Sequence, residues 1–439
     1  MEAMSHRVYQ YYFPIEHSNI ILLLLFIIPC LIFGQDKGNN LNKPKSPYYD
    51  YLEDVHMVNT QVAYAAGWAG TLVRTTNGGV YWDILHSQMD GQELGGIFFI
   101  NETTGMAVNG QIIRTTDKGE NWNIIDSGNP WYMAGISFSD ENNGFAVGVN
   151  GKITHSTDGG NSWGLQQSGT DQFLWRVSAV SAIYAYAVGG NYGGQGGVIV
   201  KTSDGGTSWH SLTLPSNAGL LGVSFVDPET GTAVGSSGTI MHTTDGGASW
   251  TIQPSGTSNL LFGVSFSDAM TGTVVGSGGV ILRTTNSGDS WISQNSNSTN
   301  NILSVSFANS MVGIAVGGSM TLPVILSTTD GGENWIDRSN APLGILNDKV
   351  SPAEFRLEQN FPNPFNPSTS IQYSVPSTQW VSINIFNSIG EQIETLVSGM
   401  VTKGVHEIIF NSKNLSSGVY FYRIEAKSSS LTKKLVILK

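Results

Sequence analysis

The stretch Thr243-Thr244-Asp245-Gly246-Gly247-Ala248-Ser249-Trp250 has six further close copies along this chain of 439 residues. The copies end at Trp82, Trp122, Trp163, Trp209, Trp250, Trp291 and Trp335. Successive tryptophans are therefore 40, 41, 46, 41, 41 and 44 residues apart. A period of about 40–45 residues is typical of β-propeller blades, each built from four short strands. The repeat predicts an all-β fold organised around a propeller.

Each copy has the composition of a tight hairpin turn. An Asp or Asn side chain accepts backbone N–H groups, and the glycine after it adopts positive φ without steric cost. The pattern Ser/Thr-x-Asp-x-Gly-x-x-Trp resembles the Asp-box, or bacterial neuraminidase repeat, of sialidases and several other propellers. The acidic or amide positions are Asn77, Asp117, Asp158, Asp204, Asp245, Asn286 and Asp330. In those families the box is structural, so the resemblance argues against a catalytic role for these aspartates.

The blade that ends at Trp250 shows the strand pattern most clearly. Its short apolar segments are residues 223–225, 233–235, 239–243 and 250–252. The same offsets start the innermost strands of the other blades at Val55, Ile97, Ile136, Val177, Val264 and Val305. Seven copies in one register between Val55 and Asn340 predict a seven-bladed propeller that begins and ends with complete blades.

Charge is unevenly distributed along the chain. The formal net charge is −12, which argues against a nucleic-acid partner. From Val55 to Asn340 there are 20 Asp and Glu against 8 Lys and Arg, whereas from Ala353 to Lys439 there are 6 against 8. The acidity therefore belongs to the predicted propeller. Charged residues make up only 12% of the chain and glycine occurs 53 times, as expected for short strands joined by tight turns.

The N-terminus has the pattern of a secretory signal peptide. Ile20 to Phe33 is apolar apart from Pro29 and Cys30, and is too short to span a bilayer comfortably. We predict a signal peptide over residues 1–34, followed by a linker over residues 35–54. Lipidation at Cys30 is the alternative, although proline precedes this cysteine. Since Cys30 is the only cysteine, cleavage would leave no thiol nucleophile, disulfide or cysteine metal site.

The character of the chain changes after residue 340. Residues 341–352 form a predicted linker, and residues 353–439 contain alternating apolar strands separated by Asn, Gly and Ser turns. This pattern predicts a small Ig-like antiparallel β-sandwich.

Three motifs in this block resemble the type A C-terminal sorting domain of the type IX secretion system. They are Asn360-Phe361-Pro362-Asn363-Pro364-Phe365-Asn366-Pro367, the turn Leu415-Ser416-Ser417-Gly418-Val419-Tyr420 and the ending Lys433-Lys434-Leu435-Val436. The resemblance implies export through the periplasm, recognition by the outer-membrane translocon and sorting machinery, and a destination that is secreted or on the cell surface.

The propeller also resembles the Asp-box propellers of the photosystem II assembly and stability factor. The shared features are a Gly-x-Ala-Val-Gly strand, a Gly-x-Ile-x-x-Thr strand and the Asp-Gly-Gly-x-x-Trp turn. This resemblance implies a protein-binding scaffold rather than an enzyme. A role in photosynthesis does not follow, because the sorting motifs direct the chain out of the cell.

One set of candidate residues lies on the channel side of the innermost strands. The position before the first apolar residue is small in most blades, namely Gly96, Gly135, Gly222, Gly263 and Ser304. Arg176 and Asp54 break this rule at the equivalent positions. A charge beside the channel must be paired or hydrated, so these two residues are either binding residues or a structural pair.

A second candidate set lies on the third strands, directly before each Asp-box. It comprises Arg74, Arg114, His155, Lys201, His242 and Arg283, with Ser327 in the seventh blade. These side chains either pair with nearby carboxylates such as Asp83 and Asp289, or form a basic band that binds an anionic partner.

The alternative function is an extracellular glycoside hydrolase, sialidase-like or xyloglucanase-like. Such enzymes need two carboxyl groups about 5–9.5 Å apart. The carboxylates outside the boxes form no recognisable pair; they include Glu93, Asp140, Glu141, Asp227 and Glu229. The Phe-Arg-Ile-Pro start of sialidases is also absent. We therefore predict a monomeric binding protein for an extracellular protein or glycan, with no catalytic residues, metal or cofactor.

Overall fold

The computed structural model describes residues 51–85, 92–125, 132–319, 322–339, 343–345, 355–360, 363–412, 415–427 and 429–438. The predicted signal peptide and most of the first predicted linker lie outside these residues. In the described part of the chain, no helix is both long and apolar enough to cross a membrane.

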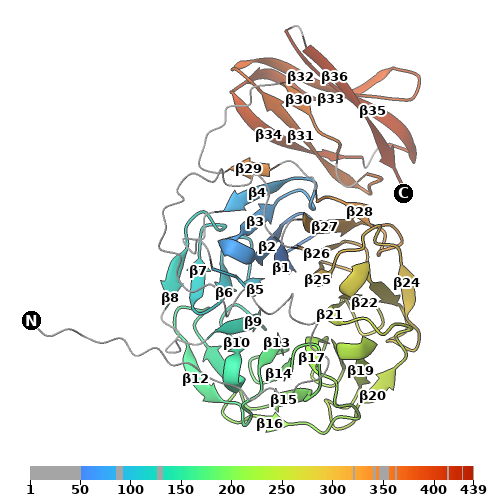
Figure 1. Ribbon diagram of the computed structural model, residues 1–439. Helices are drawn as coiled ribbons and strands as arrows, with labels where there is room; N and C mark the ends of the chain where they lie inside the picture. The colour runs from blue at the N-terminus through green and yellow to red at the C-terminus, as the bar shows by residue number, and fades with distance from the viewer. Residues whose placement is uncertain are drawn as a thin grey trace, which may run out of the picture. The chain divides into compact units, whose positions relative to one another are not determined.

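Seven sheets, antiparallel apart from one added parallel strand, form a ring around a central axis (Figure 1), which confirms the predicted propeller. Blade 1 contains β1 (Leu52–Met57), β2 (Ala63–Gly67), β3 (Leu72–Thr75) and β4 (Trp82–Leu85). Blade 2 contains β5 (Gly96–Phe99), β6 (Gly105–Val108), β7 (Ile112–Thr115) and β8 (Asn123–Ile125). Blade 3 contains β9 (Met133–Phe138), β10 (Gly144–Gly148), β11 (Lys152–Ser156) and β12 (Gly164–Gln167). Blade 4 contains β13 (Leu174–Ala179), β14 (Ala185–Gly189), β15 (Val198–Thr202) and β16 (His210–Ser211).

The remaining three blades repeat this order. Blade 5 contains β17 (Leu220–Phe225), β18 (Gly231–Gly235), β19 (Ile240–Thr243) and β20 (Thr251–Gln253). Blade 6 contains β21 (Leu261–Phe266), β22 (Gly272–Gly276), β23 (Ile281–Thr284) and β24 (Ile292–Gln294). Blade 7 contains β25 (Ile302–Phe307), β26 (Gly313–Ser319), β27 (Leu322–Thr328) and β28 (Ile336–Asp337). Short 3-10 turns follow the second strand in four blades: η2 (Trp68–Gly70), η3 (Val149–Gly151), η4 (Ser236–Gly238) and η5 (Ser277–Gly279).

The Asp-box closes the hairpin between the third and fourth strands. In blade 5 the Asp245 Oδ1 atom accepts the backbone N–H of Ser249 and the hydroxyl of Thr243, at 2.9 and 2.8 Å. The Trp250 ring meets Phe225 of the innermost strand edge-on, with 6.0 Å between ring centroids. Gly247 has φ of 84°, a conformation that residues with a side chain rarely adopt. The same edge-on contact recurs in blades 2, 3, 6 and 7, so in these five blades the box fastens the outer part of the blade to its inner strand.

The propeller core is divided among the blade interfaces. Seven buried apolar clusters each combine residues of two neighbouring blades. One cluster joins Trp82 of blade 1 to Ile314 and Val316 of blade 7, so the interface between first and last blades is packed like the others. Because no blade can bury its apolar faces alone, stability depends on the closed ring.

A repeated hydrogen bond links the innermost strands of successive blades. A serine of one blade accepts a backbone N–H of the next at 3.0–3.2 Å. The pairs are Ser137 with Ala179, Ser178 with Phe225, Ser224 with Phe266, Ser265 with Phe307 and Ser306 with Met57. The last pair connects blade 7 to blade 1, and therefore helps to close the ring without an exchanged strand.

Two segments predicted as linkers contribute strands. β1 begins at Leu52 rather than Val55, because a bulge at Glu53 lets pairing with β2 continue as far as Leu52 and Gly67. β29 (Leu343–Ile345) follows blade 7 and pairs in parallel with β4, the outermost strand of blade 1. The chain thus passes from the last blade back to the first, and residues 343–345 add a fifth strand to blade 1.

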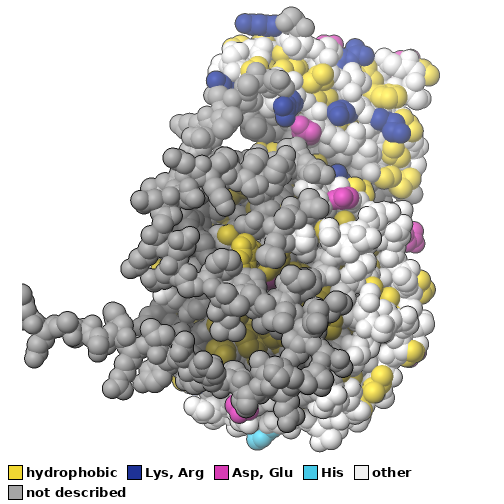
Figure 2. All heavy atoms as spheres, viewed as in Figure 1, with side chains coloured by type: hydrophobic (Ala, Val, Ile, Leu, Met, Phe, Trp, Pro, Cys, Tyr) yellow, Lys and Arg dark blue, Asp and Glu magenta, His cyan; other side chains and the backbone are white. Residues whose placement is uncertain are grey.

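The C-terminal residues form a sandwich of two antiparallel sheets around one apolar core, as predicted. One sheet has the order β30 (Arg356–Leu357), β31 (Ser368–Val375) and β34 (Gly404–Asn411). The other has the order β33 (Gln392–Val401), β32 (Gln379–Phe386), β35 (Gly418–Ala426) and β36 (Ser429–Ile437). Lys and Arg side chains gather over these strands on the face in Figure 2, in contrast to the acidic propeller.

The first and last chain segments of the sandwich are hydrogen-bonded to each other. They contain two of the motifs that resemble the sorting domain, the asparagine-rich motif and the Lys433–Val436 ending. The Asn363 side chain accepts the backbone N–H of Val436 at 2.7 Å and donates to the carbonyl of Lys434 at 3.2 Å. Phe365 exchanges backbone hydrogen bonds with the same strand, from its N–H to Val436 and from the N–H of Leu438 to its carbonyl. Residues 363–365 and the final strand therefore form one structural unit.

Candidate functional site

A pocket lies at one mouth of the propeller channel, where all seven blades contribute to its lining. Its residues are Glu53, Glu93, Gly95, Tyr132, Ala134, Trp175, Arg176, Tyr192, Leu221, Phe262 and Leu303. The innermost strands begin at this mouth, whereas the Asp-boxes connect the third and fourth strands at the opposite end of each blade. The pocket and the boxes therefore lie on opposite faces of the ring.

Most of the lining comes from a β-bulge repeated around the ring. In six blades, the register between the first two strands slips by one residue near the start of the inner strand. The extra residues are Glu53, Ala134, Trp175, Leu221, Phe262 and Leu303, and all six line the pocket. A bulge turns a side chain away from its expected direction. Strict alternation of side chains predicted that the set containing Asp54 and Arg176 faces the channel. Because of the bulge, the pocket is lined mainly by the residue directly before each member of that set.

A glycine-rich loop of blade 4 brings an additional aromatic residue to the pocket. Residues 190–197 replace the short turn of other blades, and Gly193 and Gly196 have φ of 67° and 80°. The loop is held to the start of blade 5, where the Gly219 N–H donates to the carbonyl of Gly194 at 2.8 Å. Tyr192 projects from this loop and lines the pocket.

Aromatic rings form much of the pocket wall. Trp175 lies 5.3 Å from Tyr192 between ring centroids, and Tyr192 lies 6.5 Å from Phe262. The Trp175 indole N–H donates to the carbonyl of Gly190 at 3.0 Å, which fixes its orientation. Tyr132 extends the wall on the side of blade 3.

Two carboxyl groups, Glu53 and Glu93, share the pocket with these rings. Burial, followed by repulsion from Glu93, raises the pKa of Glu53 to about 7, even though Arg176 and a hydrogen bond from Tyr51 oppose the shift. Burial also raises the pKa of Glu93, whose carboxylate accepts the Tyr132 hydroxyl at 3.4 Å. The sequence did not predict this convergence, because Glu53 lay in an assumed linker and Glu93 in a loop of another blade.

Arg176 is directed at backbone carbonyls. Its Nη1 atom donates to Ala134 at 2.9 Å and to Trp175 at 3.1 Å, and Nη2 donates to the carbonyl of Glu53 at 3.4 Å. The guanidinium thus links the inner strands of blades 3, 4 and 1 while one side of it lines the pocket.

Asp54 makes contacts between blades rather than pairing with Arg176. Its Oδ1 atom accepts the Ser304 hydroxyl at 2.7 Å and Oδ2 accepts the Ile97 N–H at 3.0 Å. At the small positions of this seam the blades are close; a Cβ on Gly135 would meet the carbonyl oxygen of Trp175 at 2.8 Å. These contacts favour a structural role for Asp54.

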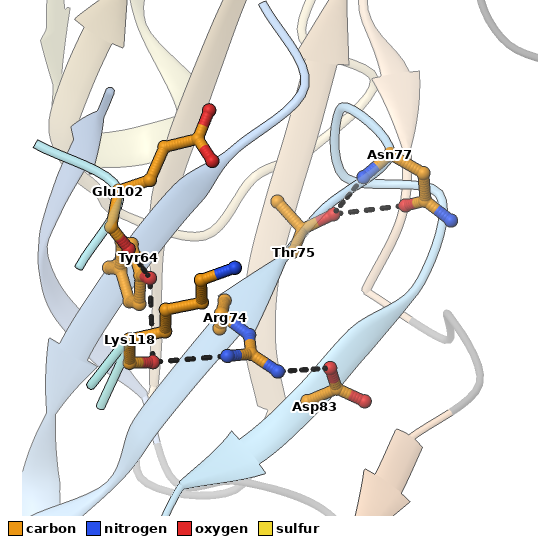
Figure 3. Close-up of polar contacts among 7 residues, drawn as sticks. All are labelled: Tyr64, Arg74, Thr75, Asn77, Asp83, Glu102 and Lys118. Atoms are coloured by element: carbon orange, nitrogen blue, oxygen red, sulfur yellow. Dashed lines mark hydrogen bonds and ion pairs between the residues drawn. The ribbon is translucent and has the colours of Figure 1, made fainter. Parts of the chain in front are cut away.

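The basic side chains before the Asp-boxes connect neighbouring blades. In Figure 3, Arg74 donates to the carbonyl of Lys118 at 3.1 Å and forms an ion pair with Asp83 at 3.3 Å. Lys118 belongs to the box of the next blade. Arg114 and Lys201 make the same contact, to the carbonyls of Gly159 and Gly246.

The other members of this set are also held within the propeller. Arg283 donates to Thr273 at 2.9 Å and to the carbonyl of Ser310 in blade 7 at 2.7 Å. His242 lies 3.0 Å from the Thr232 hydroxyl, and His155 stacks on Phe145. Burial lowers the pKa of both histidines. Ser327 accepts the Arg338 Nε–H at 3.2 Å. This pattern favours the structural interpretation of the set over a basic binding band.

The pocket suits a small group better than a large ligand. It is a cavity of about 80 Å³, whereas sites for drug-sized ligands occupy about 300–1,000 Å³. Among the described residues, no group of three or more His, Cys, Asp or Glu side chains is arranged to hold a metal ion. The pocket can offer aromatic faces, two carboxyl groups and one guanidinium to a single side chain or a few waters.

Comparisons with known proteins agree with the two parts of the fold. The family described as photosynthesis system II assembly factor YCF48 matches residues 115–217 and 208–296. A solved structure of YCF48 bound to D1 peptide has 18% identity and a TM-score of 0.54, covering 65% of this chain and 94% of its own. YCF48 from Cyanidioschyzon merolae has 16% identity and a TM-score of 0.53, covering 65% and 97%.

An ancestral GH74 enzyme has 12% identity and a TM-score of 0.54, covering 88% of this chain and 60% of its own. At these identities the structural likenesses concern the fold alone. A search of curated proteins finds no significant match.

The C-terminal residues match a second family. It is described as a secretion system C-terminal sorting domain and covers residues 359–438. This domain directs export by type IX secretion to the cell surface or extracellular space, and implies contact with the type IX machinery. The chain therefore joins a propeller, which matches the YCF48 assembly-factor model over residues 115–296, to a C-terminal segment that matches the sorting-domain model over residues 359–438.

Proposed function

We propose that this chain is an extracellular binding protein, a non-enzymatic and monomeric scaffold whose propeller holds a segment of a partner protein at the channel-mouth pocket. The observation that carries the proposal is the pocket itself, which every blade helps to line and which is fitted with aromatic rings and charged groups. Its small volume suits one side chain of a bound segment. YCF48, which shares the propeller fold, is described as bound to a peptide.

Photo-crosslinking tests this proposal. A benzophenone amino acid in place of Tyr192, in the full-length exported chain on living cells, is expected to crosslink to a protein segment. The same group in place of Ile292, which is 67% exposed on outer strand β24, serves as the control. Equal crosslinking at both positions would contradict binding at the pocket.

The convergence of Glu53 and Glu93 favours a second candidate, an extracellular glycoside hydrolase. A carboxyl group with a pKa of about 7 is suited to a general acid. The narrow cavity and the bonding of Arg176 to carbonyls weigh against this candidate. Release of sugar from xyloglucan or a sialylated glycan that is abolished by Glu53→Gln would establish the hydrolase and overturn the scaffold proposal.

A further inference from the structure

We propose that the channel-mouth pocket binds one organic cation, the side chain of a lysine or arginine presented by a partner protein. This inference rests on the proposed binding function and names the chemistry that the pocket selects. It follows from charge, from the pocket wall and from size.

The charges of the pocket favour a cation. Glu53 and Glu93 provide two carboxyl groups, whereas Arg176 is the single basic residue among the described residues that line the cavity. The Arg176 guanidinium donates to three backbone carbonyls, so it is poorly placed to bind an incoming anion. Asp54 adds a nearby negative charge, although its carboxylate oxygens already accept hydrogen bonds from the Ser304 hydroxyl and the Ile97 N–H. An entering cation would compensate repulsion between the two glutamates.

The aromatic wall also favours a cation. The positive charges of lysine and arginine are attracted to the faces of Trp and Tyr rings, and more strongly where water is excluded. Trp175 and Tyr192 stand at 61° to one another with centroids 5.3 Å apart, so two ring planes border the same small space. Burial, and then the negative charges of Glu53 and Glu93, raise the pKa of the Tyr192 hydroxyl to about 12. The hydroxyl is therefore close enough to both carboxyl groups to interact with their charges.

The apolar part of the lining matches the stem of a basic side chain. Leu221, Phe262 and Leu303 occupy consecutive blades along the pocket wall. Lys and Arg bury their methylene groups along apolar surface while the charged end reaches a polar partner. A cavity of about 80 Å³ admits such a side chain but is too small for a chain of sugar rings.

The test measures binding of short peptides to the full-length exported chain by fluorescence anisotropy. Labelled alanine-based hexapeptides, blocked at both ends, carry lysine, arginine, norleucine or glutamate at one central position. A fifth peptide contains only alanine and has a free N-terminal amine, which distinguishes a main-chain amine from a basic side chain.

Glu53→Gln and Glu93→Gln are the test variants, since each removes charge with little change of shape. Glu141→Gln is the matched control, because Glu141 is an exposed carboxylate that does not line the pocket. Lysine and arginine peptides are expected to bind at least tenfold more tightly than norleucine and glutamate peptides. Both test variants are expected to lose this preference, whereas the control keeps it.

Two results would overturn the inference and leave the binding function intact. They are tighter binding of the norleucine, glutamate or free-amine peptide, and a lysine preference that survives both test variants. If no peptide binds, the inference fails, and crosslinking at Tyr192 decides separately whether the proposed function also fails.

Discussion

Arg114 of blade 2 donates a hydrogen bond from Nε to the backbone carbonyl of Gly159, the residue after the aspartate of the Asp-box in blade 3, over 2.9 Å. Arg74 of blade 1 and Lys201 of blade 4 likewise donate to a backbone carbonyl of the next blade, that of Lys118 and that of Gly246. A cation thus satisfies a carbonyl that the tight turn of the next blade leaves without a backbone partner. Each such side chain links two blades.

Replacing Arg114 with alanine should therefore lower stability rather than binding. We expect a loss of about 1–2 kcal/mol in the free energy of unfolding, since a charged donor is removed from a partly buried carbonyl. Urea unfolding of the full-length chain measures this change. Lys118→Ala, which removes an exposed cation nearby, is expected to change stability by less than about 0.5 kcal/mol. Similar losses in both variants would contradict the assignment.

Asp54 should behave as a connector of three blades. Asp54→Ala leaves the Ser304 hydroxyl and the Ile97 N–H without an acceptor and is expected to cost about 2–3 kcal/mol. Asp54→Asn retains one acceptor oxygen and should cost less. Thermal unfolding followed by tryptophan fluorescence tests this order. An asparagine variant that is less stable than the alanine variant would rule out the hydrogen-bonding explanation.

The Asp-box aspartates should make stability sensitive to acid. Hydrogen bonds from Ser249 and Thr243 lower the pKa of Asp245 to about 2. The stabilisation from this lowered pKa is present above the unfolded pKa of about 3.8 and disappears as the pH falls towards 2. Asp245→Asn should remove this part of the acid sensitivity while preserving the turn, as asparagine occupies the same position at Asn286. Unfolding free energies measured between pH 2 and 5 test the difference.

Glu53 should produce the opposite pH dependence. Its raised pKa means that the folded state holds the proton more tightly, so the contribution of Glu53 to stability falls as the pH rises from about 4.5 to about 7. Glu53→Gln is expected to stabilise the chain at pH 8 by roughly 2 kcal/mol, after allowance for partial exposure. It should have little effect at pH 4. Equal changes in unfolding free energy at pH 4 and pH 8 would contradict a buried carboxyl group that is protonated at pH 4 and ionised at pH 8.

Binding of a lysine peptide should weaken as the pH falls below about 7, because Glu53 then becomes neutral. The other groups that face Glu53 are Glu93, Arg176, Tyr51, Asp54 and Tyr192. Anisotropy titrations at pH 5.5 and 8 measure the change, with Glu53→Gln as the control that should be less dependent on pH.

Much of the fold could be predicted because each blade of a propeller repeats the same local sequence pattern. The spacing of the tryptophans and the turn chemistry identify blades without any knowledge of long-range contacts. β29 could not be predicted in this way, since three residues after the last blade carry no periodic signal and acquire their structure by pairing with β4.

The candidate site was only partly predictable. Arg176 stood out because it interrupts a column of small residues, and it does line the pocket. Trp175 was missed because strict alternation assigns its side chain to the wrong face, and a bulge reverses that assignment. Glu53 lies at the same kind of bulge, and the sequence also placed it in a predicted linker. Tyr192 depends on an insertion, for which the 46-residue spacing before Trp209 was the available signal.

The repeated bulge also bears on how such a propeller can evolve. A bulged residue has no pairing partner on the neighbouring strand. Substitution there leaves the ladder of backbone hydrogen bonds intact, and in this chain the position already accommodates glutamate, alanine, tryptophan, leucine and phenylalanine. The frame and the recognition surface can thus vary independently, so descendants of one ancestral ring could acquire new partners by exchanging a handful of side chains around a single circle.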